Sequence, residues 1–198
     1  MPAAGQIKIL NSAFKLFSER GFDGVSIRDI AADAGLTNPA LYRHYPSKEA
    51  LGLALYRKAY DAVLEAVEGR VRTSMPALDK LDAYLDACVD LHRIKPSPLL
   101  FLDEMHNVFW PKVREEYGDH TVAALLIAWI REGQKSGDIR GDIDAVMLST
   151  VPQGVLSQWA VMARHHIAPW SGAADTLKHL MRDALAPPHE VKPPLHSP

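Results

Sequence analysis

The sequence has 198 residues, 47% of them hydrophobic and one of them a cysteine, which excludes a disordered chain, a disulfide framework and a zinc site built from thiolates. It has neither a secretory signal pattern nor about 18 consecutive apolar residues, so we expect a protein of the reducing cytoplasm with no membrane partner. The net charge is −2, but residues 1–58 carry eight Lys and Arg against five Asp and Glu while residues 59–198 carry 14 against 19, an asymmetry that suits a phosphate-binding N-terminal part.

Three short helices are predicted near the N-terminus. Ser26 and Asp29 have the spacing of a capping box, in which a hydroxyl and a carboxylate satisfy backbone amides at the start of a helix. Gly35 follows that helix and can adopt the left-handed conformation that closes it, and Thr37 can cap the next helix. The helices are expected over residues 6–20, 27–33 and about 38–44, with stops at Gly21, Gly35 and Tyr45-Pro46.

The rest of the chain is predicted to be helical almost throughout, with no strand alternation and no internal repeat. A long fourth helix capped by Ser47 is expected to reach about Arg72. Pro111 is expected to break residues 99–117 into two pieces, and Pro152 to kink an apolar helix further on. The further helices are expected over residues 78–95, 99–109, 112–117, 119–136, 143–164 and 173–185.

The second and third helices, joined by a tight glycine turn, have the layout of a helix-turn-helix, the motif that places its second helix in the major groove of DNA. Ala31 lies where the two helices are expected to cross, and a larger side chain there would push them apart. The apolar residues of both helices are expected to face the core. The third helix is then expected to expose hydrogen-bond donors, a phenol and small side chains, namely Asn38, Pro39, Ala40, Tyr42, Arg43 and His44.

The stretch GFDGVSIRDIAADAGLTNPALYRHYPSKEAL, residues 21–51, resembles the DNA-binding signature of TetR-type regulators. The shared features are a capping Ser/Thr, an Ile-Ala pair, Gly-Leu-Thr at the turn, Leu-Tyr in the third helix, and the run aromatic-Pro-Ser-Lys-Glu-Ala-Leu after that helix. The resemblance covers about residues 5–60. It implies a homodimeric transcriptional regulator that binds a palindromic operator in double-stranded DNA and responds to a small molecule.

The resemblance also implies which residues contact DNA. Thr37, Tyr42 and Lys48 would contact phosphates, Arg28 and Asn38 would lie near base edges, and the last two residues of the third helix would lie at the groove margin. An arginine can grip guanine with two hydrogen bonds and an asparagine can pair with adenine. Tyr42 also suits a core aromatic, and Lys48 an ordinary exposed lysine. The candidate DNA-binding residues are Ser26, Arg28, Thr37, Asn38, Pro39, Ala40, Tyr42, Arg43, His44 and Lys48.

These patterns together predict an all-α fold of about nine helices, with an N-terminal three-helix helix-turn-helix domain and a C-terminal helical ligand-binding and dimerisation domain. The C-terminal tail holds five prolines and no packing pattern, so it is expected to be disordered. The expected parts are residues 1–46 for DNA binding, 47–74 for the connecting fourth helix, 75–186 for ligand binding and dimerisation, and 187–198 for the tail.

A small reading helix contacts only a few base pairs, so adequate specificity calls for two copies on a palindrome. The helices over residues 143–164 and 173–185 are the candidates for the dimer contact, although they also suit an ordinary core. Their apolar residues exceed what one intrachain face needs, and include Val146, Met147, Val151, Val155, Trp159 and Met162.

The larger helical part is expected to hold a ligand cavity, as the family resemblance implies. Many aromatic side chains with a few amides and imidazoles suit a flat or lipophilic molecule with one or two polar atoms. No cofactor and no metal are expected. The candidate ligand-binding residues are Tyr84, Cys88, His92, Phe101, Met105, His106, Trp110, Trp129, Gln153, Gln158 and Trp159.

Three other functions remain open at this point. An enzyme is not expected, because His165-His166 and the pair Glu104 and His106 belong to no nucleophile elbow, phosphate loop or zinc-protease motif. A metal-responsive regulator is an alternative, with ligands drawn from Cys88, His92, Glu104 and His106. A DNA-binding protein without an effector is another. The preferred hypothesis is a repressor whose effector moves the fourth helix. This movement would change the distance between the third helices of the two copies, so that they no longer match the operator.

Overall fold

The computed structural model describes residues 4–94, 97–169 and 171–188, and every regular element within these ranges is an α-helix. The helices are α1 (Ala4–Arg20), α2 (Ile27–Asp33), α3 (Asn38–His44), α4 (Lys48–Glu68), α5 (Ala77–Arg93), α6 (Pro98–Tyr117), α7 (Val122–Ser136), α8 (Ala145–Arg164) and α9 (Ala173–Leu185). The predicted all-α class is confirmed. Most of the tail expected to be disordered, residues 189–198, lies outside the described residues.

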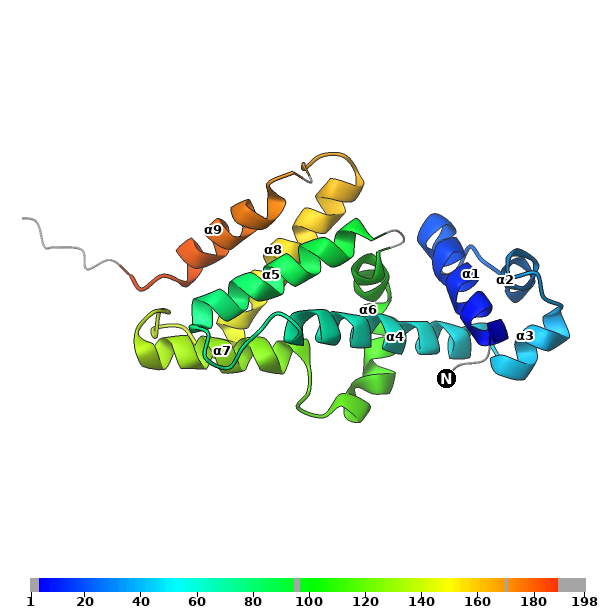
Figure 1. The fold of residues 1–198 in the computed structure, drawn as a ribbon, viewed down its shortest axis with the longest axis horizontal. Helices are drawn as coiled ribbons and strands as arrows, with labels where there is room; N and C mark the ends of the chain where they lie inside the picture. The colour runs from blue at the N-terminus through cyan, green and yellow to red at the C-terminus, as the bar shows by residue number, and fades with distance from the viewer. Residues whose placement is uncertain (1–3, 95–96, 170, 189–198) are drawn as a thin grey trace, which may run out of the picture.

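The helices form a small head and a larger body (Figure 1). The head consists of α1, α2 and α3, and the body is built from α5 to α9. Helix α4 runs from the head into the body and packs most extensively against α6, which also contacts α1. None of the helices in the described ranges combines the length and apolar character needed to cross a membrane.

Local signals set the head's geometry as predicted. Gly21 and Gly35 have φ angles of +72° and +66°, the left-handed region that glycine adopts without strain. After Gly35 the chain turns sharply, and the Leu36 amide donates to the carbonyl of Ala31 at 2.8 Å. The Ala31 side chain is fully buried, so a larger residue there would separate α2 from α3.

Three predicted boundaries were wrong. Pro111 does not break its segment, because α6 is continuous through it. Proline removes only one helical hydrogen bond, and Phe109 and Val113 on either side are fully buried and keep the helix packed. Helix α4 ends at Glu68 rather than near Arg72. The helix predicted from residue 119 begins instead after Thr121, whose hydroxyl accepts from an amide of the first turn.

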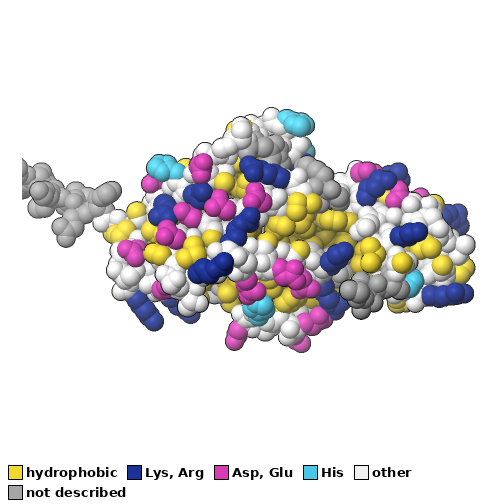
Figure 2. All heavy atoms as spheres, in the orientation of Figure 1, with side chains coloured by type: hydrophobic (Ala, Val, Ile, Leu, Met, Phe, Trp, Pro, Cys, Tyr) yellow, Lys and Arg dark blue, Asp and Glu magenta, His cyan; other side chains and the backbone are white. Residues whose placement is uncertain are grey.

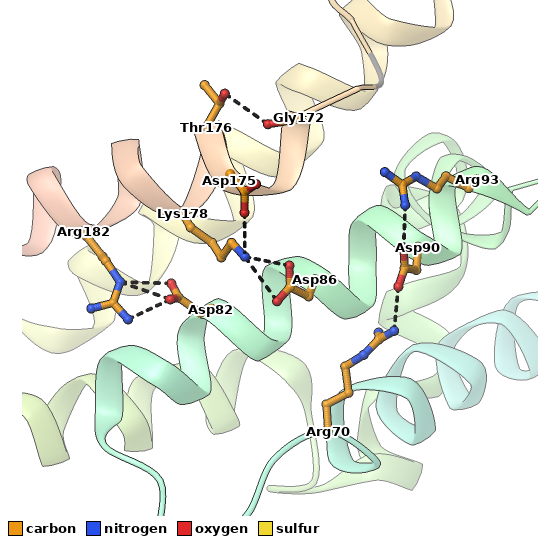
Figure 3. A network of polar contacts seen from close by, with 10 residues as sticks. All are labelled: Arg70, Asp82, Asp86, Asp90, Arg93, Gly172, Asp175, Thr176, Lys178 and Arg182. Atoms are coloured by element: carbon orange, nitrogen blue, oxygen red, sulfur yellow. Dashed lines mark hydrogen bonds and ion pairs between the residues drawn. The ribbon is translucent and has the colours of Figure 1, made fainter.

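Ion pairs join one side of α9 to α5 (Figure 3). Arg182 contacts Asp82 at 2.7 Å, and Lys178 contacts Asp86 at 3.0 Å. Each pair is partly exposed and worth at most about 1 kcal/mol. Their structural consequence is orientation: they set which side of α9 faces α5, and leave Leu180 half exposed on another side.

Candidate functional site

The two short helices of the head begin with side-chain caps. The Ser26 hydroxyl accepts from the amide of Asp29 at 3.2 Å, while the Asp29 carboxylate accepts from the Ser26 amide at 2.8 Å. The Thr37 hydroxyl accepts from the amide of Ala40 at 3.3 Å. The predicted capping box is therefore present, and both Ser26 and Thr37 use their hydroxyls to hold the helix starts in place.

The outward face of α2 and α3 carries the predicted DNA-binding residues. Pro39, Arg43 and His44 are exposed, and Tyr42 keeps half of its surface exposed. Four of the predicted residues, Ser26, Arg28, Asn38 and Tyr42, line one hollow of about 360 Å³ with Ile27. A guanidinium, an amide and a phenol thus converge on a single exposed site, which is the set of donors that nucleic-acid recognition uses.

Two acidic residues of this region, Asp29 and Asp33, form hydrogen bonds or an ion pair within the head. The Ser26 hydrogen bonds lower the pKa of Asp29, and the Lys15 ammonium, 2.8 Å from Asp33, lowers the pKa of that carboxyl. Both carboxylates are thereby engaged within the head. Arg28 and Arg43 form no ion pair with any residue that the structure describes, so their charges remain available to an anionic partner.

Lys48 supports the loop ahead of α2. Its ammonium donates to the carbonyls of Phe22 and Val25 at 3.1 and 3.2 Å and lies 4.6 Å from the centre of the Phe22 ring. An ammonium has three donors, and these carbonyls use two of them. Tyr45, which directly follows α3, is buried, and its hydroxyl accepts a hydrogen bond from the Gln6 side chain at 3.2 Å.

A second candidate site is a cavity of about 280 Å³ inside the body, called here the central cavity. Its walls come from all five helices α4 to α8. This size is at the lower end for small-molecule pockets, which are mostly apolar with a few polar groups. The lining residues are Tyr56, Tyr60 and Val63 of α4, Tyr84 and His92 of α5, Leu99, Leu102, Asp103, His106 and Trp110 of α6, Val122 and Ala123 of α7, and Gln153, Leu156 and Ser157 of α8.

The polar groups of the central cavity are arranged in pairs. The Tyr56 hydroxyl and His106 Nδ1 share a hydrogen bond of 3.1 Å, and the Ser157 hydroxyl donates to Asp103 at 3.1 Å. Desolvation raises the pKa of Asp103 and lowers the pKa of His106. Both side chains still reach solvent, so these shifts reflect the water that the surrounding walls displace rather than complete burial.

The structure brings only some of the predicted ligand-binding residues to the central cavity. Those that line it are Tyr84, His92, His106, Trp110 and Gln153. Gln158 and Trp159 line a separate groove between α8 and α9, while Cys88, Phe101, Met105 and Trp129 lie buried away from both. Sequence reasoning missed Tyr56, Tyr60, Asp103 and Ser157. The spacing of Tyr56 and Tyr60, one turn apart on an inward helix face, was the available signal for the tyrosines.

The groove between α8 and α9 has a volume of about 530 Å³ and is largely apolar. Gly154, Val155 and Met162 contribute to one wall, and Leu177 and Leu180 to the other. The adjoining surface of α8 also exposes apolar side chains. Exposed apolar residues of these two helices are Val146, Met147, Val161 and Leu180.

Of the residues weighed as metal ligands, only His92 and His106 line the same cavity. Glu104 pairs with Arg164 across α6 and α8, and Cys88 is fully buried, which raises the pKa of its thiol to about 12. Within the described ranges, no group of three or more His, Cys, Asp or Glu side chains has an arrangement that could hold a metal ion.

Comparisons with known proteins agree with this geometry. The family model for bacterial regulatory proteins of the tetR family matches residues 9–55. The transcriptional repressor KstR2 of Mycolicibacterium smegmatis is 31% identical over 147 residues, covering 72% of this chain and 71% of that protein. The transcriptional repressor AcnR of Corynebacterium glutamicum is 27% identical over 164 residues, covering 82% and 85%. A crystal structure of a tetR-family regulatory protein from Rhodococcus RHA1 matches with a TM-score of 0.81 at 19% identity, covering 93% of this chain and 98% of that one.

The capped helix pair with its outward donors, carried on a separate helical body, defines a helix-turn-helix transcriptional regulator. The family model and the similarity to KstR2 make the assignment more specific. The chain belongs to the TetR family of transcriptional regulators.

Proposed function

We propose that this chain is a repressor that binds a palindromic operator as a homodimer and leaves it when a small molecule occupies the central cavity. The observation that carries the DNA-binding part is the convergence of Arg28, Asn38 and Tyr42 on one exposed hollow of the helix-turn-helix. The relatives AcnR and KstR2 are named as repressors, which supports repression as the outcome, whereas FasR of Mycolicibacterium smegmatis, which is similar over a shorter stretch, is named as an activator.

The DNA-binding part is tested with Arg28→Ala. A guanidinium that grips a guanine contributes about 1–3 kcal/mol of discrimination, or about 5- to 150-fold in affinity, at one base pair of each half-site. Fluorescence anisotropy with the upstream DNA and its single-base variants measures this loss. Arg131→Ala removes an exposed, unpaired arginine from α7 and serves as the matched control. Equal behaviour of the two variants would contradict the assigned role.

The dimer is proposed to form through α8 and α9. The ion pairs with α5 occupy one side of α9, and the α8/α9 groove opens on another, with Leu180 half exposed on its wall. An apolar groove of this size beside exposed Val146 and Met147 is unusual for a surface that stays in water. Burying it against the same surface of a second copy gives a two-fold symmetric contact.

Sedimentation equilibrium of Leu180→Glu tests this interface. A carboxylate at the groove wall would be buried without a partner in the dimer, so we expect the dimer to dissociate at least about 100-fold more readily. Val108→Glu is the matched control, because Val108 is an exposed apolar residue of α6 with a similar exposure. If both variants dimerise like the unaltered protein, the α8/α9 interface is wrong.

The route from the central cavity to the head is proposed to run through α6 and α4. His106 and Trp110 line the cavity, while Phe101 on another face of the same helix stacks on Phe17 of α1 at 6.2 Å and meets Phe14 edge-on at 5.9 Å. A ligand that shifts α6 would therefore move the Phe101 ring, which is in direct contact with α1 of the head.

The seam between head and body is apolar, which suits such a movement. Figure 2 shows hydrophobic side chains gathered on the surface where the two parts meet. Leu10 and Phe14 of α1 form a groove of about 200 Å³ with Leu55, Leu91 and Ile94. Apolar contacts are not directional, so the contacts across this groove do not by themselves fix one angle of the head.

Operator release is tested by screening small molecules for binding by thermal shift and then titrating each binder against the protein–operator complex. Effectors of this kind are expected to weaken operator binding by about 5- to 150-fold. Phe101→Leu, which weakens the contact between α6 and α1, should keep the ligand affinity and lose part of the release. A saturating ligand that leaves operator affinity unchanged would contradict the mechanism.

A further inference from the structure

We propose that the central cavity recognises an organic cation, namely an amine or quaternary ammonium group on an apolar body, with the Asp103 carboxylate as its counter-ion. This inference rests on the proposed role of the cavity as the effector site. It goes further by assigning the charge of the ligand, which neither the family nor the relatives' names specify.

The charge balance of the cavity wall is the first argument. Among its 15 lining residues there is no lysine and no arginine, and Asp103 is the one carboxylate. Its hydrogen-bond donor in the structure is the neutral hydroxyl of Ser157. A carboxylate has about four acceptor positions, so most of its capacity remains open to a ligand. The neighbouring acid on the helix, Glu104, is instead paired with Arg164.

The histidine beside Asp103 does not supply the missing positive charge. Desolvation lowers the pKa of His106, and its Nδ1 is bound to the Tyr56 hydroxyl, so the imidazole is favoured in its neutral form. An anionic ligand would meet the Asp103 carboxylate in a cavity that no lysine or arginine lines. A cationic ligand would relieve the cost of placing that carboxylate in a partly desolvated site.

Aromatic rings form the rest of the surroundings. Tyr60 and Trp110 lie 5.1 Å apart between ring centres, with Tyr56 next to Tyr60 and Tyr84 on the α5 wall. Burial raises the pKa of each of these tyrosines, so they stay neutral and present π faces rather than competing charges. Aromatic faces attract ammonium groups most strongly when these are desolvated.

Four probes with one apolar body separate the contribution of charge from that of shape. They are 4-phenylbutylamine, its trimethylammonium analogue, 4-phenylbutanol and 5-phenylvalerate, which all carry a phenyl ring on four methylene groups, each titrated into the protein by calorimetry. We expect both cations to bind at least about 10-fold more tightly than the alcohol, and the carboxylate to bind most weakly. Asp103→Asn should remove the advantage of the cations and leave the affinity for the alcohol unchanged.

Glu104→Gln is the matched control, since it removes the same charge one residue away at a side chain that does not line the cavity. The pH dependence of the trimethylammonium probe gives an independent readout, because this probe does not titrate. Its affinity should rise as Asp103 loses its proton and then level off. The other titratable groups that act on Asp103, namely Glu104, His106, Tyr56, Tyr84 and Cys88, are unchanged in Asp103→Asn, so a rise that persists in this variant would come from them and contradict the role of Asp103.

Two results would overturn the proposal in different ways. If the alcohol binds as tightly as the ammonium probes and Asp103→Asn changes neither, the preference for cations is wrong while the cavity remains an effector site. If none of the four probes binds at millimolar concentration, the cavity itself is not a site for ligands of this size, and the proposed release mechanism fails with it.

Discussion

Replacing Gly52 with alanine tests the packing of the junction between head and body. A Cβ atom at this position of α4 would lie 2.7 Å from both Phe22 and Phe109, whereas carbon atoms normally stay about 3.5–4 Å apart. The two rings are themselves packed edge to face, 5.6 Å between centres, so neither can withdraw freely. Overpacking of this kind costs about 1–3 kcal/mol, and the better helix propensity of alanine returns about 1 kcal/mol. We expect a net loss of up to about 2 kcal/mol, or a Tm lower by up to about 8 °C.

Thermal unfolding followed by circular dichroism, at one fixed protein concentration, measures this loss. Gly141→Ala is the control, because a Cβ atom there has nothing within 4 Å and should leave the Tm almost unchanged. Adding Phe109→Leu to Gly52→Ala removes two of the three closest ring atoms, so the two changes together should cost less than the sum of each alone. A double variant whose cost equals the sum of the two single costs would refute the described packing.

Three further predictions concern single residues. Lys48→Met should lower the unfolding free energy in urea by about 1–3 kcal/mol, because two carbonyls lose their donor, and should weaken operator binding in a gel-shift titration. Arg182→Ala should cost at most about 1 kcal/mol in the same urea assay, and the cost should shrink as salt rises, since its pairs with Asp79 and Asp82 are partly exposed. Burial raises the folded-state pKa of Asp103, so the folded state keeps this proton to higher pH and stability falls as pH rises through that range. Asp103→Asn should therefore unfold at a higher temperature than the unaltered protein near neutral pH, and at the same temperature in acid below the unfolded-state pKa.

The head could be predicted closely because its signals are local. Ser26, Thr37 and Ser47 cap the helices that follow them, and Gly21 and Gly35 lie where a left-handed residue ends a turn. Each of these signals involves residues that are close together in the sequence, so both partners of the interaction can be recognised without knowing the fold. The predicted division of the chain into domains remains a prediction.

The central cavity could be predicted only in part, because it depends on how each helix is rotated about its axis. Helix α6 has two apolar faces, and sequence spacing does not say which one faces the head. Phe101 was expected in the cavity but lies against α1, whereas Asp103, two residues later, lines the cavity. Asp103 precedes Glu104 and so had the pattern of a solvated helix face. The rotation of α6 is set by its contacts with α1, α4 and α8, which are distant in sequence.

The central claim is that α3 enters the major groove of an operator, and site-directed DNA cleavage tests it most directly. Cys88 is buried, so Arg43→Cys creates a single accessible thiol for an iron–EDTA reagent, and Lys135→Cys on α7 is the control. We predict that Arg43→Cys cuts the upstream DNA in two clusters about one helical turn apart, and that Lys135→Cys cuts it nowhere. Bound DNA left uncut by the first protein, or cut equally by both, would contradict the claim.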